Sequence, residues 1–106
     1  MGDLLRSQAD LLILAVLQSG PAHGYSIIEE IKRRSQGQFD LPEGTIYPAL
    51  HRLETEGLLA SDWQQAEGRR RRVYRLTAHG LEAGRQRNAE WQRFARAMQA
   101  VTGAEA

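Results

Sequence analysis

The sequence predicts a mainly α-helical protein with one small β-hairpin, in the order helix, helix, helix, hairpin, helix. Apolar residues recur at spacings of three and four before residue 57 and again after residue 78, as is typical of helices. Between them, residues 59–76 alternate in polarity around a polar turn that contains glycine, which is typical of a hairpin. A chain of 106 residues has room for one small domain with a thin core, so we expect oligomerisation to add to its stability.

Composition excludes several classes of protein. The chain has no cysteine, which rules out disulfides and thiolate metal sites. Its apolar run at residues 11–17 is too short to span a bilayer, and Asp3 and Asp10 argue against a secretory signal. We therefore expect a cytoplasmic protein with no membrane partner. The net charge is only +1, so any polyanion must bind a local patch of charge.

Cap and stop residues delimit the first three helices. Ser7 is expected to cap the first helix, which is apolar nearly all round and so should be deeply buried. A second helix is expected over residues 24–36. A third is expected over residues 42–57, with Asp40 and Glu43 at the spacing of a capping box.

The period of the pattern changes after the third helix. Short strands are expected at residues 59–63 and 73–76, joined by a polar turn at residues 64–68. Thr77 is the expected N-cap of a last helix that runs to about Val101.

The outer side of the third helix has an unusual composition. Ile46, Leu50 and Leu53 form its inward stripe, whereas the opposite side presents small, hydroxyl and cationic residues in place of the usual Glu and Lys. Such residues suit contacts to phosphates and base edges. The alternatives are a solvated face of accidental composition and, for Tyr47, packing on the hairpin as ordinary core. The candidate DNA contacts on this helix are Gly44, Thr45, Tyr47, Pro48, His51 and Arg52.

Four consecutive arginines, residues 69–72, are expected at the hairpin tip and the start of its second strand. Alternation should send Arg70 and Arg72 to one face and Arg69 and Arg71 to the other. The run could merely increase solubility, but four adjacent like charges with few acids nearby favour an anionic partner. Arg69, Arg70 and Arg71 are therefore candidate contacts to a DNA backbone or minor groove. Trp63 and Tyr74 are interpreted as inward-facing residues of this hairpin.

The last helix carries an apolar stripe at spacings of three and four. The core is already closed by its own helices, so we expect the stripe to meet a second chain; the alternative is that it folds back on its own domain. A twofold dimer would fit duplex DNA with two half-sites, a pseudo-palindromic operator. The candidate dimerisation residues are Leu4, Leu5, Trp91, Phe94, Ala95, Met98 and Val101.

Three ordered motifs resemble the PadR family of transcriptional regulators: HGYSI at residues 23–27, LPEGTIYPALHRLETEGL at residues 41–58 and GRRRRVYRLT at residues 68–77. The resemblance implies a winged helix-turn-helix domain at residues 1–78, a dimerisation helix at residues 79–106, and usually repression of a nearby operon. One departure is Pro42, which stands where many members have a serine-like cap.

The resemblance also implies roles for single residues. By position, Tyr25 and Lys32 would flank phosphates from the second helix. Some short members hold flat aromatic molecules between tryptophans, so Trp91 and Phe94 are candidate contacts for a small aromatic effector. Simple interface packing is the alternative role for Trp91.

Catalysis finds no support in the sequence. His23, His51 and His79 fall on separate elements without a neighbouring carboxylate or nucleophile, and no short-spaced metal ligands or phosphate-binding glycine motif occur. We therefore predict a protein that is not an enzyme and has no metal or cofactor. The competing interpretations of the fold are a winged-helix module that docks on proteins, and a small-molecule-binding dimer with little specific DNA binding.

Overall fold

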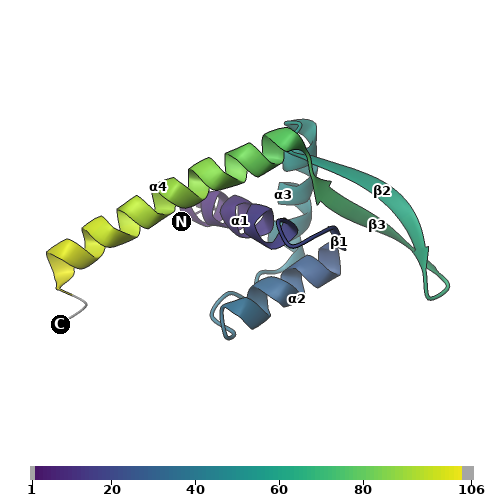
Figure 1. Ribbon diagram of the computed structural model, residues 1–106. Helices are drawn as coiled ribbons and strands as arrows, with labels where there is room; N and C mark the ends of the chain where they lie inside the picture. The colour runs from purple at the N-terminus through teal and green to yellow at the C-terminus, as the bar shows by residue number, and fades with distance from the viewer. Residues whose placement is uncertain (1, 104–106) are drawn as a thin grey trace.

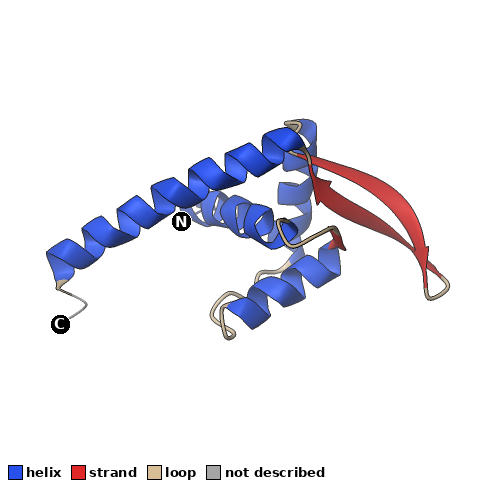
Figure 2. Ribbon diagram, in the orientation of Figure 1, coloured by secondary structure: helices blue, strands red, loops and turns tan. Residues whose placement is uncertain are grey.

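The computed structural model describes the backbone of residues 2–103 and the side chains of residues 8–65 and 67–103. Its elements confirm a mainly α-helical protein with a small antiparallel sheet (Figures 1 and 2). In chain order they are α1 (Gly2–Leu17), β1 (Ala22–His23), α2 (Gly24–Arg34), α3 (Glu43–Thr55), β2 (Leu59–Ala66), β3 (Arg69–Leu76) and α4 (Ala78–Thr102).

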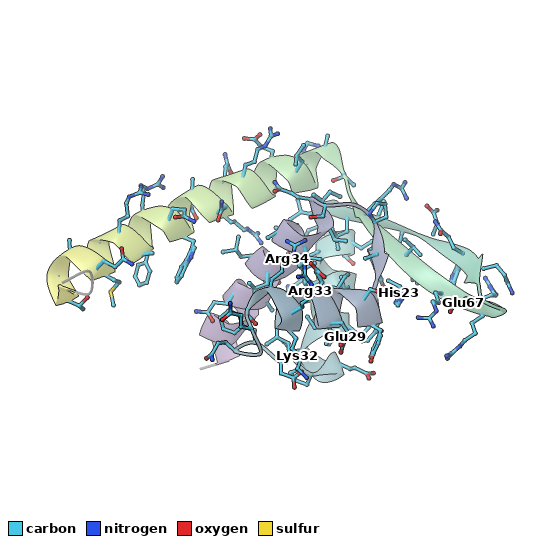
Figure 3. The ribbon with its side chains drawn as sticks, turned by 60° about the horizontal axis from the view of Figure 1, so that its bottom comes forward. His23, Glu29, Lys32, Arg33, Arg34 and Glu67 are labelled. Carbon is cyan, nitrogen blue, oxygen red and sulfur yellow. The ribbon has the colours of Figure 1, made fainter. Side chains whose placement is uncertain are left out.

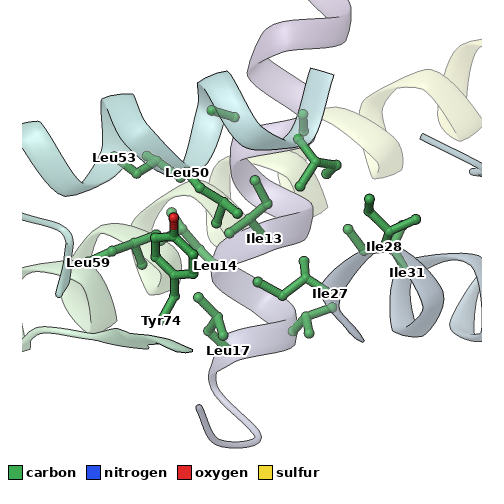
Figure 4. Close-up of a cluster of buried hydrophobic side chains, with 14 of the residues drawn as sticks. Ile13, Leu14, Leu17, Ile27, Ile28, Ile31, Leu50, Leu53, Leu59 and Tyr74 are labelled. Atoms are coloured by element: carbon green, nitrogen blue, oxygen red, sulfur yellow. The ribbon is translucent and has the colours of Figure 1, made fainter. Parts of the chain in front are cut away.

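Helix α1 lies at the centre of the core, and α2, α3 and α4 all pack against it (Figure 4). Its side chains Ile13 and Leu14 are fully buried, as are Leu50 and Leu53 on α3. Burial of apolar surface is the main force that holds these helices together. Tyr74 on β3 joins the same cluster, which confirms that its side chain faces inward. The nearly all-round apolar pattern of α1 is thus explained by its central position.

The sheet is longer than the sequence suggested, and its strand order is β1-β3-β2. Strands β2 and β3 stay paired from Leu59↔Leu76 out to Ala66↔Arg69. The turn is therefore the two residues Glu67 and Gly68, with φ of 52° and 76°. Positive φ at both positions matches the twist that a two-residue hairpin needs. The prediction of a five-residue turn was wrong, because Gln64 and Gln65, which have no strong strand preference, still continue the ladder.

Two of the predicted caps were also wrong, and one is confirmed. Ser7 lies inside α1, which begins at Gly2. Pro42 occupies the N-cap position of α3 and provides no side-chain cap, so Asp40 does not cap this helix. Thr77 caps α4 as predicted: its hydroxyl oxygen accepts a hydrogen bond from the Gly80 amide at 3.0 Å.

None of the helices in the described part of the chain is long and apolar enough to cross a membrane. The long helix α4 continues past the helical core and gives the molecule its extended shape, 52 × 28 × 25 Å (Figure 1).

Close approach at the start of α4 predicts the effect of one substitution. A Cβ atom at Gly80 would collide with the backbone carbonyl oxygen of Leu58, which already accepts the Thr77 amide at 3.1 Å. We expect Gly80→Ala to lower the free energy of unfolding by about 1–3 kcal/mol, measured by urea denaturation. Gly84→Ala is the control, because its Cβ would make only an ordinary contact, 3.4 Å from the Leu14 Cβ. A stable Gly80→Ala protein would contradict this account of the junction.

Candidate nucleic-acid interface

A groove of about 490 Å³ lies where α2, α3 and the β2–β3 hairpin meet. Aromatic rings and guanidinium groups line it together. The lining residues are His23, Gly24, Tyr25, Tyr47, Trp63, Arg69, Arg70, Arg71 and Arg72. The structure thus brings residues predicted separately, on the second helix, the third helix and the hairpin, to one surface.

The outer side of α3 is open as the helical wheel predicted. Gly44, Pro48 and His51 are exposed and Thr45 is half-buried, while Ile46 and Leu50 are fully buried on the other side. An open helix face with little side-chain bulk allows a close approach to a flat or grooved surface. Pro48 lies within α3 without ending it.

Tyr47 packs against the first residue of α2. Its ring lies so close to Gly24 that a Cβ atom there would be 2.5–2.6 Å from the ring and hydroxyl atoms. The absence of a side chain at the first residue of α2 therefore gives Tyr47 its place. The side chain remains 41% exposed, so it is packed on one side and open to the groove on the other.

The hairpin arginines alternate between the two faces of the sheet, as predicted. The guanidinium groups of Arg70 and Arg72 lie over the Trp63 ring, 4.8 and 5.4 Å from its centroid. Trp63 is 54% exposed. The interpretation of Trp63 as an inward-facing residue of the hairpin was therefore wrong, because the hairpin extends beyond the core and more than half of this side chain is open to solvent there. Trp63 is a groove residue that the sequence analysis missed; its register opposite Arg72 is the signal that would have identified it.

Arg71, on the other face, contacts a histidine. Its Nη1 atom lies 3.0 Å from Nε2 of His23, and the Ser26 amide donates to Nδ1 of the same ring at 3.4 Å, which makes His23 the N-cap of α2. Burial lowers the pKa of His23, and the positive charge of Arg71 lowers it further. A neutral imidazole has one ring nitrogen that accepts, so it can serve one of these two donors at a time, whereas a protonated ring can accept from neither.

The cations of α2 and of the hairpin differ in their partners. Lys32, Arg33 and Arg34 lie on the last turn of α2 (Figure 3). Arg33 and Arg34 both donate to Glu30, which lowers the pKa of that carboxyl to about 2, and Lys32 lies 3.6 Å from Asp40. Among the described side chains, by contrast, Arg69, Arg70 and Arg71 have no carboxylate within 4.0 Å; Arg72 has Glu54 at 3.7 Å. Most of the positive charge that lacks an acidic partner in this region is therefore on the hairpin, since Arg33 and Arg34 share one carboxylate.

The two predicted contacts on α2 lie at different places. Tyr25 is 57% exposed and borders the groove. Lys32 is exposed in the last turn of α2, away from the groove residues, and its ammonium group is paired with Asp40.

Arg52 does not lie on the open side of α3. Its Nη2 atom donates to Oδ1 of Asp10 on α1 at 2.5 Å, and its side chain is 31% exposed. The helical wheel places Arg52 at the edge of the outer side, and the buried carboxylate on α1 draws it inward. This long-range pair was not foreseeable from the local pattern.

The apolar stripe of α4 has no cover in the described part of the chain. Trp91, Phe94, Met98 and Val101 are 43%, 56%, 50% and 88% exposed, and Ala95 is half-buried between them. A cavity of about 480 Å³ lies between this helix and α1, lined by Gln8, Asp10, Leu11, Arg87, Glu90, Trp91 and Phe94. The side chains of Leu4 and Leu5 lie outside the described residues.

Three helices, a β-hairpin beside the third helix and a groove rich in aromatic and arginine side chains define a winged helix-turn-helix protein. The model of the PadR-like transcriptional regulator family matches residues 13–86 of the chain. The chain belongs to this family.

Relatives and solved structures agree with that membership. The chain is 39% identical over 83 residues to the transcriptional regulator Rv3488 of Mycobacterium tuberculosis, covering 78% of this chain and 75% of the relative. It resembles a transcriptional regulator of Clostridium thermocellum, Cth-833, with a TM-score of 0.83 and 31% identity over 92% of this chain and 96% of the other. A PadR family regulator of Clostridium difficile matches with a TM-score of 0.77 and 32% identity, over 89% and 97% of the two chains.

The His23 contacts predict a dependence of stability on pH. Because the pKa of His23 is lower in the folded protein, the unfolded chain binds the proton first, at about pH 6.5. Stability present above that pH is therefore lost as the pH falls from about 6.5 through the lower folded-state value. We expect the wild type to lose more stability than His23→Asn between about pH 7.5 and 5.5, measured by urea denaturation. His79→Asn, at an exposed histidine of α4, is the control; equal losses in wild type and His23→Asn would refute the assignment.

Proposed function

We propose that this chain is a sequence-specific DNA-binding repressor that acts in the cytoplasm as a homodimer and releases its operator when a small aromatic effector binds. The observation that carries the proposal is a groove in which Tyr47, on the open side of α3, lies beside a hairpin whose first three arginines have no acidic partner among the described side chains. In this proposal residues 1–78 bind DNA and residues 79–106 dimerise.

The outer side of α3 is proposed to read base edges in a major groove. Gly44 and Pro48 permit close approach, and Thr45, Tyr47 and His51 supply donors and acceptors. Arg52 is left out of this set because its guanidinium is held by Asp10. Tyr25 is proposed to contact a phosphate beside the groove, and Lys32 to reach one only if it leaves Asp40.

The hairpin is proposed to bind the DNA backbone and the adjacent minor groove as a wing. Guanidinium groups form bidentate hydrogen bonds with phosphate oxygens and carry their charge at every physiological pH. Arg69, Arg70 and Arg71 would supply affinity that depends little on sequence, whereas α3 supplies preference.

A second copy of this chain is proposed to cover the stripe of α4. The exposed rings of Trp91 and Phe94 lie 5.7 Å apart, and Met98 and Val101 continue the same face. In a twofold dimer the same face of α4 from each chain forms the interface, and the two DNA-binding domains are brought together as a pair. A bound dimer represses by covering promoter DNA. The cavity beside Trp91 and Phe94 is the proposed effector site, since two rings favour a flat aromatic molecule.

Binding to two kinds of duplex tests the proposed function. One duplex is selected by the protein from a random pool, and the other is an unselected sequence. Tyr47→Ala should weaken binding to the selected duplex about tenfold and affect the unselected one little. Arg70→Ala with Arg71→Ala should weaken both and reduce the salt slope by up to about 2.

Arg93→Ala with Arg96→Ala, at exposed arginines of α4, removes the same charge far from the groove and is the control. If the wild type prefers no selected sequence, or if both double variants behave alike, the assignment of the groove to DNA is wrong.

The dimer is tested by charging the stripe. A carboxylate at residue 98 would be buried without a partner in the proposed interface, so Met98→Glu should convert the dimer to a monomer at micromolar concentration, measured by sedimentation velocity. Gln92→Glu adds the same charge on the other side of α4 and should remain dimeric. A dimeric Met98→Glu protein would mean that another surface joins the chains.

A further inference from the structure

A single carboxylate in the core bonds to two helices at once. Asp10 on α1 is only 9% exposed and is the one charged residue counted as buried among the described side chains. Its Oδ1 atom accepts from Nη2 of Arg52 on α3 at 2.5 Å, and its Oδ2 atom lies 3.6 Å from Nη1 of Arg87 on α4. Each oxygen therefore serves a different helix.

The two contacts share one charge and so depend on each other. A carboxylate removed from water needs its partners, because an uncompensated buried charge is strongly unfavourable. When Arg87 moves away, Asp10 loses part of this compensation and one of the two contacts that orient it. The hydrogen bond from Arg52 to Asp10 then changes as well, because both arginines bind the same carboxylate.

The position of Asp10 connects the two candidate sites. Its carboxylate and Arg87 line the cavity between α1 and α4, beside Trp91 and Phe94. Its other partner, Arg52, belongs to the helix that carries Tyr47 and the open face of the groove. A molecule in the cavity, or a shift of α4, would meet Arg87 and Asp10 before it could affect α3.

We propose that Asp10 is a positioning residue that couples α4 to α3, so that changes at the α1–α4 cavity alter how firmly α3 is held. The consequence for DNA binding rests on the proposed function, but the coupling itself does not. Asp10 is not among the residues that line the groove.

Hydrogen exchange of the protein without DNA tests the coupling. Arg87→Gln should speed exchange of α3 amides near Arg52 at least threefold, with α2 amides unchanged. The same substitution should have no further effect on α3 when Asp10→Asn is already present. If Asp10→Asn does not fold, Arg52→Gln takes its place, because it removes the ion pair between Asp10 and Arg52 from the other side. Arg93→Gln, which removes the same charge from an exposed side chain of α4 outside the cavity, is the control and should leave α3 unchanged.

An effect of Arg87→Gln on α3 that is absent, or that persists in the Asp10→Asn or Arg52→Gln background, would overturn the proposal. A second measurement separates it from the proposed function. Arg87→Gln should weaken binding to the selected duplex at least threefold and Arg93→Gln should not; unchanged binding in Arg87→Gln would overturn the transmission to DNA. A wild type that binds no duplex would refute the proposed function, while the exchange experiment would still decide the coupling.

Discussion

The burial of α1 between three other helices is the constraint on which the rest of the structure depends. Ile13 and Leu14 can be excluded from water only if α2, α3 and α4 all pack around them. That packing fixes the direction of α3, and the short connection from α3 through Leu58 fixes where the hairpin leaves the core. The strand β1, paired with β3, holds the base of the hairpin against the start of α2. The packing of the core therefore fixes the positions of α3 and of the hairpin, and so the location of the groove between them.

The sequence predicted the elements whose residues decide their own structure. The third helix, the Thr77 cap and the alternation of the arginines follow from spacing and local chemistry. The hairpin length did not, since Gln64 and Gln65 take their conformation from the strand opposite. The two-residue strand β1 carries no periodic signal, and its pairing with Tyr74 and Val73 exists only in the folded chain.

In the candidate site, too, the sequence predicted what depends on local pattern and missed what depends on contacts between distant residues. The composition of α3 and the run of arginines indicated the surface on which the groove lies, because exposed side chains need no knowledge of tertiary contacts. Arg52 and Trp63 were misplaced because each depends on a partner distant in sequence or across the ladder. Arg52 meets a carboxylate 42 residues away, and Trp63 lies beyond the end of the core, where Arg70 and Arg72 lie over its ring. Whether a residue at the edge of a helical or strand pattern is buried or exposed therefore depends on partners that are distant in sequence.

The choice of partners also explains how a chain with a net charge of +1 keeps a strongly positive hairpin. On α2, the Glu30 carboxylate binds both Arg33 and Arg34 and cancels one of their two positive charges. On the hairpin, Arg70 lies over an aromatic ring and Arg71 against a neutral histidine. Such neutral partners restrict a side chain that would otherwise lose about 2 kcal/mol of rotamer entropy on binding, and they leave its charge intact. Cation–π contacts of this exposed kind contribute about 0.5–1 kcal/mol, enough to favour one orientation yet weak enough to give way to a phosphate. The hairpin is thus ordered before it meets an anion without being neutralised in advance.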